Sequence, residues 1–368
     1  MLASDEVTYR FEYEDRIRCA FIGAGGHSYR NVYPALQYAP VDLVAVCDLN
    51  VDRAREYARL FGAATAYADY REMLEKERPA AVFVVTSYTP EGRMQATEIA
   101  MDCLRAGAHV WTEKPTAASV AEIIGLQKES VATGRFVMTG LKKIFTPAMS
   151  KVKEIIDSEE FGRVGSLSVR YPQHLPAAEE RGDLHAMRGF LDHIYHPAAV
   201  VNYLMGPIER FSFEREPATG SSVTSMRFTS GAVGTMHLAA GAALTSPLER
   251  VEVTGEGANV VVENSVSLTY YRRGGRMPYG RSPSYVVPDD VAPLHWEPEY
   301  SLGQLYNKNL FYLGYVPEVL HFCDSVLAGT PPQKGTLDDS LAIMRLFEAY
   351  QRNTEGTTIV LTGNEEQR

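Results

Sequence analysis

The chain has 368 residues, of which 45% are apolar and 22% are charged, a composition typical of a globular protein. That length exceeds what a single hydrophobic core usually serves, so we expect two domains. The net charge of −10 argues against nucleic-acid binding, because a phosphate backbone calls for clustered lysine and arginine.

Cysteine usage and hydropathy predict a cytoplasmic protein. The four cysteines at 19, 47, 103 and 323 are widely spaced and form no CxxC pair. We therefore expect neither a disulfide framework nor a zinc knuckle. The N-terminal segment is acidic and contains no apolar signal sequence. No apolar run reaches the roughly 20 residues of a membrane span, so no membrane partner is expected.

The first part of the chain alternates between apolar strands and helical patterns, the signature of βαβ units and a parallel sheet. We predict strands at residues 18–22, 43–47, 81–85 and 109–111. Helical spacing covers residues 51–61, 94–106 and 118–133, and each of these segments stops at or just before a glycine.

Beyond residue 145, short alternating runs separated by Gly, Pro and Ser predict closely spaced strands. These runs lie at 166–171, 211–213, 222–228, 232–239, 250–254, 259–262 and 266–271. Helical spacing returns at 315–328 and 337–350, and the irregular stretch from 272 to 298 predicts an excursion or lid. We therefore expect an α+β domain at residues 143–368 with a large, mainly antiparallel open sheet.

A glycine-rich turn at residues 23–28 follows the first predicted strand. Gly23 permits a tight turn, and Gly25 with Gly26 lets the backbone approach a pyrophosphate. His27 continues the turn, and Ser28 stands where the third glycine of GxGxxG would be. Ser28 is small enough to keep strand and helix close. The turn predicts a dinucleotide-binding Rossmann domain at residues 1–142, with residues 1–16 as an N-terminal extension.

Asp48 ends the second predicted strand, 22 residues after Gly26, where a ribose-binding acid is expected. A carboxylate there accepts hydrogen bonds from both ribose hydroxyls and repels a 2′-phosphate. The next residue is Leu49 and not an arginine, so NAD is favoured over NADP. The alternative is that Asp48 only caps the helix that begins near Asp52.

Glu113, Lys114 and Pro115 follow an apolar strand, which places Lys114 at the carboxyl edge of the parallel sheet. Open α/β sheets bind their ligands at that edge. Pro115 biases Lys114 away from helical geometry and permits a cis peptide bond. We expect the lysine to face the nicotinamide end of a bound dinucleotide. The alternative is a solvated lysine on an exposed loop.

Asp192 and His196 form a second candidate pair, four positions apart and therefore on one face of a helix. A histidine can accept an alcohol proton, and a carboxylate can orient it or support its cationic form. Pro197 disfavours helical geometry at His196 and fits the first position of a helix ending at Gly206. We therefore expect the pair on a kinked turn. His196 could instead merely cap that helix.

With these elements in place, the chain resembles the Gfo/Idh/MocA family, named for glucose–fructose oxidoreductase and inositol dehydrogenase. The segments that carry the resemblance are GAGGHS after the first strand, CDLN at 47–50, AGAHVWTEKP at 106–115 and DHIYH at 192–196. TGLKKIFTPA at 139–148 and GYVPEVLHFCDSVLAG at 314–329 add to it. The family implies oxidation or reduction of a hydroxyl of a sugar, inositol or related polyol with NAD or NADP. It also implies a homodimer or homotetramer formed through the C-terminal sheet.

The resemblance implies three catalytic residues. Lys114 matches the family lysine near nicotinamide and substrate, Asp192 the acidic residue, and His196 the proton-accepting histidine. Lys143 falls close to a frequent basic substrate contact. Further tentative substrate contacts are His174, His185 and Arg188.

The chain departs from the family pattern at four places. Ile194 replaces a common glycine, and Pro197 is unusual after the histidine. Ala96 stands where a histidine is frequent, and residues 86–95 form a longer connection than usual. These departures affect nicotinamide packing and substrate shape, but they remove no catalytic group.

Other functions remain open on the sequence. A lyase or glycosidase acting through transient sugar oxidation would share the coenzyme and the same residues. His185, Asp192, His193 and His196 could gather around a cation, although we predict no metal site there. A non-catalytic binding protein fits poorly with the presence of Lys114, Asp192 and His196.

Overall fold

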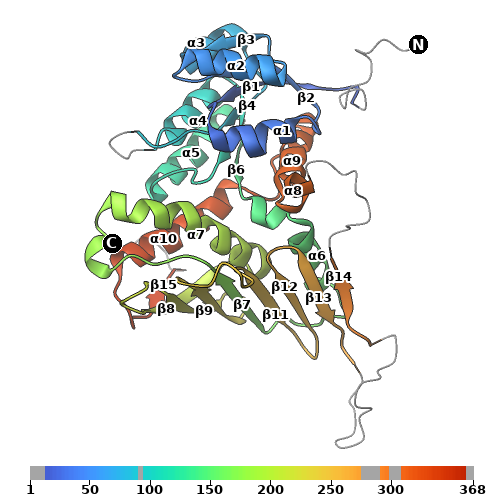
Figure 1. Cartoon of the computed structure of the whole chain (residues 1–368), viewed down its shortest axis with the longest axis vertical. Coiled ribbons are helices and arrows are strands. Elements are labelled where there is room, and N and C mark those ends of the chain that lie inside the picture. Colours follow the sequence, from blue (N-terminus) through green and yellow to red (C-terminus); the bar gives the residue numbers. More distant parts are fainter. Residues whose placement is uncertain (1–12, 90–93, 275–290, 298–307, 362–368) are drawn as a thin grey trace, which may run out of the picture. The chain divides into compact units, whose positions relative to one another are not determined.

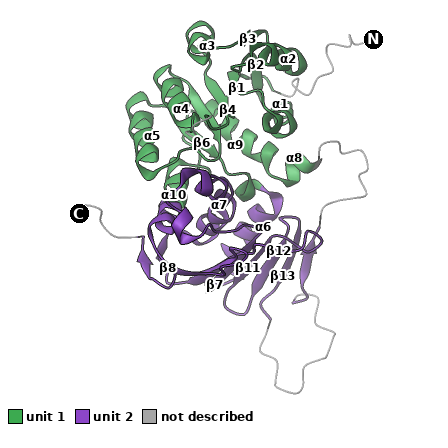
Figure 2. Cartoon of the chain, turned by 60° about the vertical axis from the view of Figure 1, so that its left-hand side comes forward, with its two compact units in different colours: residues 1–145, 309–344 green, residues 146–308, 345–368 purple. Residues whose placement is uncertain are grey.

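A computed structural model describes residues 13–89, 94–274, 291–297 and 308–361. The chain divides into two compact units, residues 1–145 with 309–344 and residues 146–308 with 345–368 (Figure 2). From the sequence we predicted a domain boundary between residues 142 and 143, with all later residues in the second domain. In the structure, residues 309–344 belong to unit 1. Most of the predicted N-terminal extension lies outside the described residues.

Unit 1 contains a parallel sheet of six strands in the order β3-β2-β1-β4-β5-β6 (Figure 1). The strands are β1 (Ile17–Ile22), β2 (Val41–Cys47), β3 (Thr65–Tyr67), β4 (Ala81–Val84), β5 (His109–Glu113) and β6 (Val137–Gly140). All four residues of β4 are buried, as expected for a parallel strand covered on both faces. The strand order reverses between β1 and β4, and ligands bind at the carboxyl ends of the strands at such a switch point.

Helices complete unit 1. They are α1 (Tyr33–Leu36), α2 (Val51–Phe61), α3 (Tyr70–Glu77), α4 (Ala96–Arg105), α5 (Val120–Thr133), α8 (Lys308–Tyr312) and α9 (Tyr315–Ala328), with a 3-10 turn η4 (Lys142–Phe145). Helix α2 has the predicted bounds. Its N-cap is Asn50, whose side chain accepts a hydrogen bond from the Arg53 N–H at 3.1 Å. The alternative prediction that Asp48 caps this helix is therefore wrong.

Unit 2 contains a nine-stranded sheet in the order β14-β13-β12-β11-β7-β10-β9-β8-β15. The strands are β7 (Ser166–Tyr171), β8 (Ile208–Arg215), β9 (Ser222–Phe228), β10 (Val233–Leu238), β11 (Arg250–Thr254), β12 (Asn259–Glu263), β13 (Ser267–Tyr271), β14 (Leu294–Trp296) and β15 (Ile359–Val360). Only β7 and β10 pair in parallel, and the other neighbours are antiparallel. The predicted fold class, a Rossmann domain followed by a mainly antiparallel open sheet, is confirmed.

One face of the nine-stranded sheet is covered by α6 (Pro147–Ile156) and α7 (Leu184–Met205) (Figure 1). Residues 345–352 of α10 (Leu337–Arg352) also belong to unit 2, where the Tyr350 ring packs against Phe211. In β9, buried and exposed residues alternate along the whole strand. Such alternation is typical of a sheet with one face in the core and the other outside it.

Helix α7 is continuous through Pro197, so the predicted kinked turn and the predicted helix start at Pro197 are wrong. The helix begins after Asp183, whose side chain accepts a hydrogen bond from the His185 N–H. An internal proline costs about 3 kcal/mol. The helix also buries large apolar side chains, including Phe190 and Ile194, and each contributes roughly 1.5–3 kcal/mol. Packing therefore outweighs the lost hydrogen bond.

The lid predicted at residues 272–298 lies largely outside the described residues, which here include only 272–274 and 291–297. Within the part of the chain that the structure describes, no helix combines the length and the apolar character of a membrane span.

Candidate active site

The glycine turn after β1 leaves a free cradle at the carboxyl edge of the unit 1 sheet. Gly23 has a φ of 110°, and a Cβ there would lie 1.9 Å from the Val85 carbonyl oxygen, so only glycine fits. At Gly25 a Cβ would meet no atom within 4 Å, which leaves space for a ligand. Ser28 is fully buried, and its hydroxyl donates to the Gly25 carbonyl at 2.8 Å. The serine thus closes the turn in place of a third glycine.

Asp48 lies beside this turn with both carboxylate oxygens engaged. Oδ2 accepts the Ala24 N–H at 2.8 Å, and Oδ1 accepts the Asn50 N–H at 2.8 Å and the Arg53 guanidinium at 2.7 Å. Burial raises the pKa of Asp48, but these donors and the Arg53 charge outweigh burial and lower it. Asp48 is therefore a carboxylate anion held against the glycine turn.

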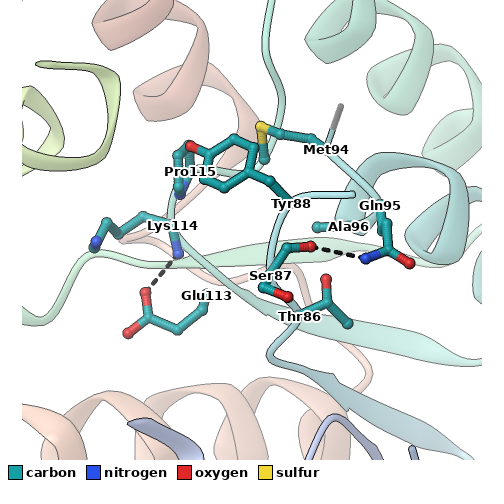
Figure 3. A pocket seen from close by; sticks show the side chains of 9 residues that line it. All are labelled: Thr86, Ser87, Tyr88, Met94, Gln95, Ala96, Glu113, Lys114 and Pro115. Carbon is teal, nitrogen blue, oxygen red and sulfur yellow. Dashed lines mark hydrogen bonds between the residues drawn. The ribbon is translucent and has the colours of Figure 1, made fainter. Parts of the chain in front are cut away.

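Two adjoining pockets extend along the carboxyl edge within unit 1. The larger, of about 560 Å³, is lined by the glycine turn, Asp48, Arg53 and the segment after β4. The smaller shares Thr86, Ser87 and Gln95 with it and is closed by Glu113, Lys114 and Pro115 (Figure 3). We call the two together the coenzyme groove. An acid for a ribose, a glycine turn for a pyrophosphate and a lysine at the far end fit a dinucleotide.

Glu113 connects the glycine turn to Lys114. Its Oε1 lies 2.7 Å from His27 Nε2, and its Oε2 accepts the Lys114 N–H at 2.6 Å. Figure 3 shows this second bond, with the Lys114 side chain extending away from Tyr88. The Lys114–Pro115 peptide bond is cis.

The connection between β4 and α4 shapes the smaller pocket. Tyr88 and Met94 pair as an isolated antiparallel bridge, and Gln95 donates to the Ser87 carbonyl at 2.9 Å. The Tyr88 ring lies beside Pro115 (Figure 3). Ala96, at the position where a histidine is frequent in the resembling family, is buried at the start of α4. The described residues at the two ends of this connection, 86–88 and 94–95, therefore form a wall of the smaller pocket.

Asp192 and His196 both lie on α7 in unit 2, one helical turn apart and half-buried. The His196 ring is 5.9 Å from the ring of Tyr171 at the end of β7. Burial raises the pKa of Tyr171, and the charges of Glu249 and Asp192 add to that effect, so the phenol stays neutral. A histidine and a carboxylate one turn apart can move and support a proton.

The four tentative substrate contacts fall in both units. Lys143 is buried in η4 of unit 1. His174 follows β7 and is exposed, and Arg188 Nη2 lies 2.9 Å from His185 Nδ1 on the first turns of α7. Among the residues that the structure describes, no group of three or more His, Cys, Asp and Glu could hold a metal ion.

Two contacts in the site were not predicted from the sequence. Arg53 on Asp48 could have been found, because both residues flank the start of α2 and lie five positions apart. The His27–Glu113 pair joins residues 86 positions apart, which no local pattern reveals.

Two family models match this chain. One, described as an oxidoreductase family with an NAD-binding Rossmann fold, matches residues 17–141, and the GFO/IDH/MocA C-terminal domain matches residues 149–261. The chain belongs to the Gfo/Idh/MocA oxidoreductase family. The predicted family is confirmed, and this Gfo/Idh/MocA protein is an NAD(P)-dependent oxidoreductase.

Relatives of this Gfo/Idh/MocA oxidoreductase include two inositol dehydrogenases. The myo-inositol 2-dehydrogenase of Thermotoga maritima is 24% identical over 335 residues, 87% of this chain and 91% of that protein. The scyllo-inositol 2-dehydrogenase (NAD(+)) of Bacillus subtilis is 26% identical over 68% of this chain and 74% of its own length. An Agrobacterium radiobacter oxidoreductase, solved with NAD+, L-tartaric acid and magnesium, shares the fold at a TM-score of 0.75 and 13% identity, covering 94% of this chain and 98% of its own.

Proposed function

We propose that this protein is an NAD-dependent dehydrogenase that transfers a hydride between nicotinamide and a hydroxyl-bearing carbon of a sugar, inositol or related polyol. The observation that carries the proposal is the coenzyme groove, which runs from the Asp48 anion past the glycine turn to Lys114. The two inositol dehydrogenases among the relatives support a polyol substrate.

The choice of NAD over NADP rests on Asp48. Its carboxylate would accept hydrogen bonds from the adenosine ribose and would repel a 2′-phosphate. Arg53 carries the opposite charge, but Asp48 already holds it at 2.7 Å, so the pair offers little net attraction for a phosphate. The Bacillus subtilis relative is likewise named for NAD(+).

Three side chains would carry the chemistry. The bound nicotinamide supplies the hydride acceptor at its C4. Lys114 would donate a hydrogen bond to the reacting oxygen and stabilise negative charge there. His196 would accept the hydroxyl proton, and Asp192, one turn away on α7, would support the resulting imidazolium. Lys143, His174, His185 and Arg188 are proposed contacts for the remaining polar groups of the substrate.

A second copy of this chain is the proposed protein partner. The sheet face not covered by α6 and α7 carries exposed apolar side chains on several strands, including Val223, Val233 and Tyr271. Such a face would pair readily with its copy in a homodimer or homotetramer. Val233→Glu should then shift the mass measured by light scattering to that of a smaller species, and an unchanged mass would contradict this interface.

The activity is tested with a panel of sugars, inositols and sugar acids in the presence of NAD, read as NADH absorbance. At least one polyol should reduce NAD. Lys114→Ala and His196→Ala should abolish turnover while NADH binding, read by its fluorescence, remains. Turnover retained in either variant would contradict the assigned roles. Substrate cleavage with recycled coenzyme and no net NADH would favour the lyase or glycosidase alternative.

A further inference from the structure

Glu318 is a buried carboxyl group that the proposed chemistry does not use. It lies in α9 with 1% of its surface exposed. By geometry, neither of its oxygens has a hydrogen-bond partner among the described residues. The Leu141 N–H lowers the pKa of Glu318 but donates its hydrogen bond to the Thr139 carbonyl at 2.8 Å. A buried carboxyl without hydrogen bonds is costly and therefore calls for a compensating reason.

The surroundings of Glu318 contain two half-buried lysines. Lys142 Nζ donates to the Tyr315 hydroxyl at 2.9 Å and lies 4.6 Å from the centre of that ring. Lys334 Nζ lies 4.4 Å from the centre of the Phe145 ring. Burial lowers the pKa of both lysines, and the charge of Glu318 counteracts this in each case. A negative charge on Glu318 thus stabilises the ammonium form of both lysines.

This charge cluster adjoins Glu113, which lines the lysine end of the coenzyme groove. The carboxylate of Glu113 acts on both Glu318 and Lys142. The Tyr315 ring also packs edge-on against His27, the partner of Glu113, at 6.0 Å. All these groups belong to unit 1.

The backbone fixes the cluster in place. Gly314 has a φ of 89°, and a Cβ there would lie 2.1 Å from the Lys142 carbonyl oxygen. The start of α9 therefore lies directly against η4. This close approach places the first turn of the Glu318 helix beside the Lys142 backbone.

We propose that the charge of Glu318, balanced against Lys142 and Lys334, sets the relative affinity of the coenzyme groove for oxidised and reduced nicotinamide. The inference rests on the proposed position of the nicotinamide beside Lys114. The ring carries a positive charge in NAD+ and none in NADH. When the Glu318 carboxyl group is ionised, its charge therefore acts on one coenzyme form and not on the other.

The effect has a definite sign and size. A unit charge near a bound cation in a partly buried setting changes the affinity for that cation by roughly tenfold. Glu318→Gln should weaken NAD+ binding relative to NADH by this factor at alkaline pH, where the carboxyl group is ionised. Lys334→Gln should shift the ratio in the opposite direction. A variant that only loosened the fold would weaken both forms together.

The ratio should also depend on pH. Burial raises the pKa of Glu318, as does Glu113, while Lys142, the Leu141 N–H and Lys334 act in the opposite direction. The carboxyl group therefore ionises more fully as pH rises. The difference between the wild-type protein and Glu318→Gln should accordingly be larger at alkaline than at neutral pH.

The test measures dissociation constants of NADH by fluorescence and of NAD+ by calorimetry, on the full chain at neutral and alkaline pH. Asp324→Asn is the matched control, because it removes the same charge from an exposed position of α9 and should leave the ratio unchanged. Opposite shifts in Glu318→Gln and Lys334→Gln support the inference, and Lys334→Gln still tests it if Glu318→Gln fails to fold. Unchanged ratios at both pH values, with both coenzyme forms binding, would overturn it and leave the proposed function standing. Absence of coenzyme binding by the wild-type protein would overturn both.

Discussion

Arg53 donates a hydrogen bond of 2.7 Å to the same Asp48 carboxylate that holds the Ala24 N–H of the glycine turn. The arginine side chain is 48% exposed and Asp48 only 8%. A ribose hydroxyl can therefore displace the exposed guanidinium from Oδ1 at small cost, whereas two backbone N–H groups hold the carboxylate itself.

Asp48→Ala should weaken NADH binding by about 10- to 100-fold, because hydrogen bonds to a charged group contribute roughly 1.5–3 kcal/mol each. Arg53→Ala should leave NADH binding nearly unchanged and weaken residual NADPH binding, because the arginine is the cation nearest to Asp48. Fluorescence titration of both coenzymes checks each variant. Equal NADH affinity in the wild type and Asp48→Ala would show that Asp48 does not bind the ribose.

The His27–Glu113 pair should matter for coenzyme binding more than for stability. His27→Phe keeps an aromatic ring against Tyr315 and removes the contact of 2.7 Å with Glu113. Because the histidine side chain is 43% exposed, the pair adds little to the free energy of unfolding. We expect NADH binding to weaken about threefold as Glu113 loses the partner that fixes it. Tyr29→Phe, at an exposed position directly after the glycine turn, is the control and should bind NADH normally.

Arg181 in unit 2 connects the segment before α7 to the C-terminal segment of the described chain. It is 1% exposed and donates to the carbonyls of Pro176 at 3.0 Å and Asn353 at 3.2 Å, and to the Glu355 carboxylate. Its guanidinium also lies 5.2 Å from the centre of the Phe213 ring.

Arg181→Met should lower the free energy of unfolding by about 3 kcal/mol, because it leaves a carboxylate and two carbonyl groups without their donor. Denaturant unfolding followed by circular dichroism measures the loss. NADH binding should not change, since the coenzyme groove lies in unit 1. Arg163→Met, which removes an exposed ion pair with Glu256, should have no measurable effect on unfolding. Similar stability in the two variants would contradict the role of Arg181.

His109 should make unit 1 sensitive to acid. It is 8% exposed, and burial, followed by the charge of Arg135, lowers its pKa from 6.5 to about 4. The unfolded chain therefore binds the proton more readily in that interval, and stability falls as pH falls from about 6.5 to about 4. The loss can reach about 3 kcal/mol. His109→Gln should flatten this part of the dependence in urea unfolding, and an unchanged slope would contradict the assignment.

Local sequence signals predicted much of the fold. The alternation in β7, β9 and β11 and the glycine ends of α2 and α9 act within a few residues, and the predicted bounds of these five elements match the structure. The glycine turn and Asp48 were found in the same way. Pro197 was misread because its local cost is outweighed by the burial of α7, which depends on distant strands and helices.

Contacts between distant segments could not be read from the chain. Arg181 and Glu355 are 174 positions apart, and Lys142 and Tyr315 are 173 apart. Neither pair shares a motif or a period. The position of residues 309–344 in unit 1 could not be predicted for the same reason, because it depends on the packing of α9 against α1, β1 and η4.

The proposed function assigns Lys114 and His196 to hydride transfer from a polyol carbon to nicotinamide. Its most direct test uses the polyol that reacts in the panel, deuterated at the reacting carbon, with the mass of the enzyme-bound coenzyme as the readout. We expect the wild-type protein to form reduced coenzyme that carries one deuterium, and Lys114→Ala and His196→Ala to form none. Turnover of that polyol by the wild-type protein without deuterium in the nicotinamide would contradict it.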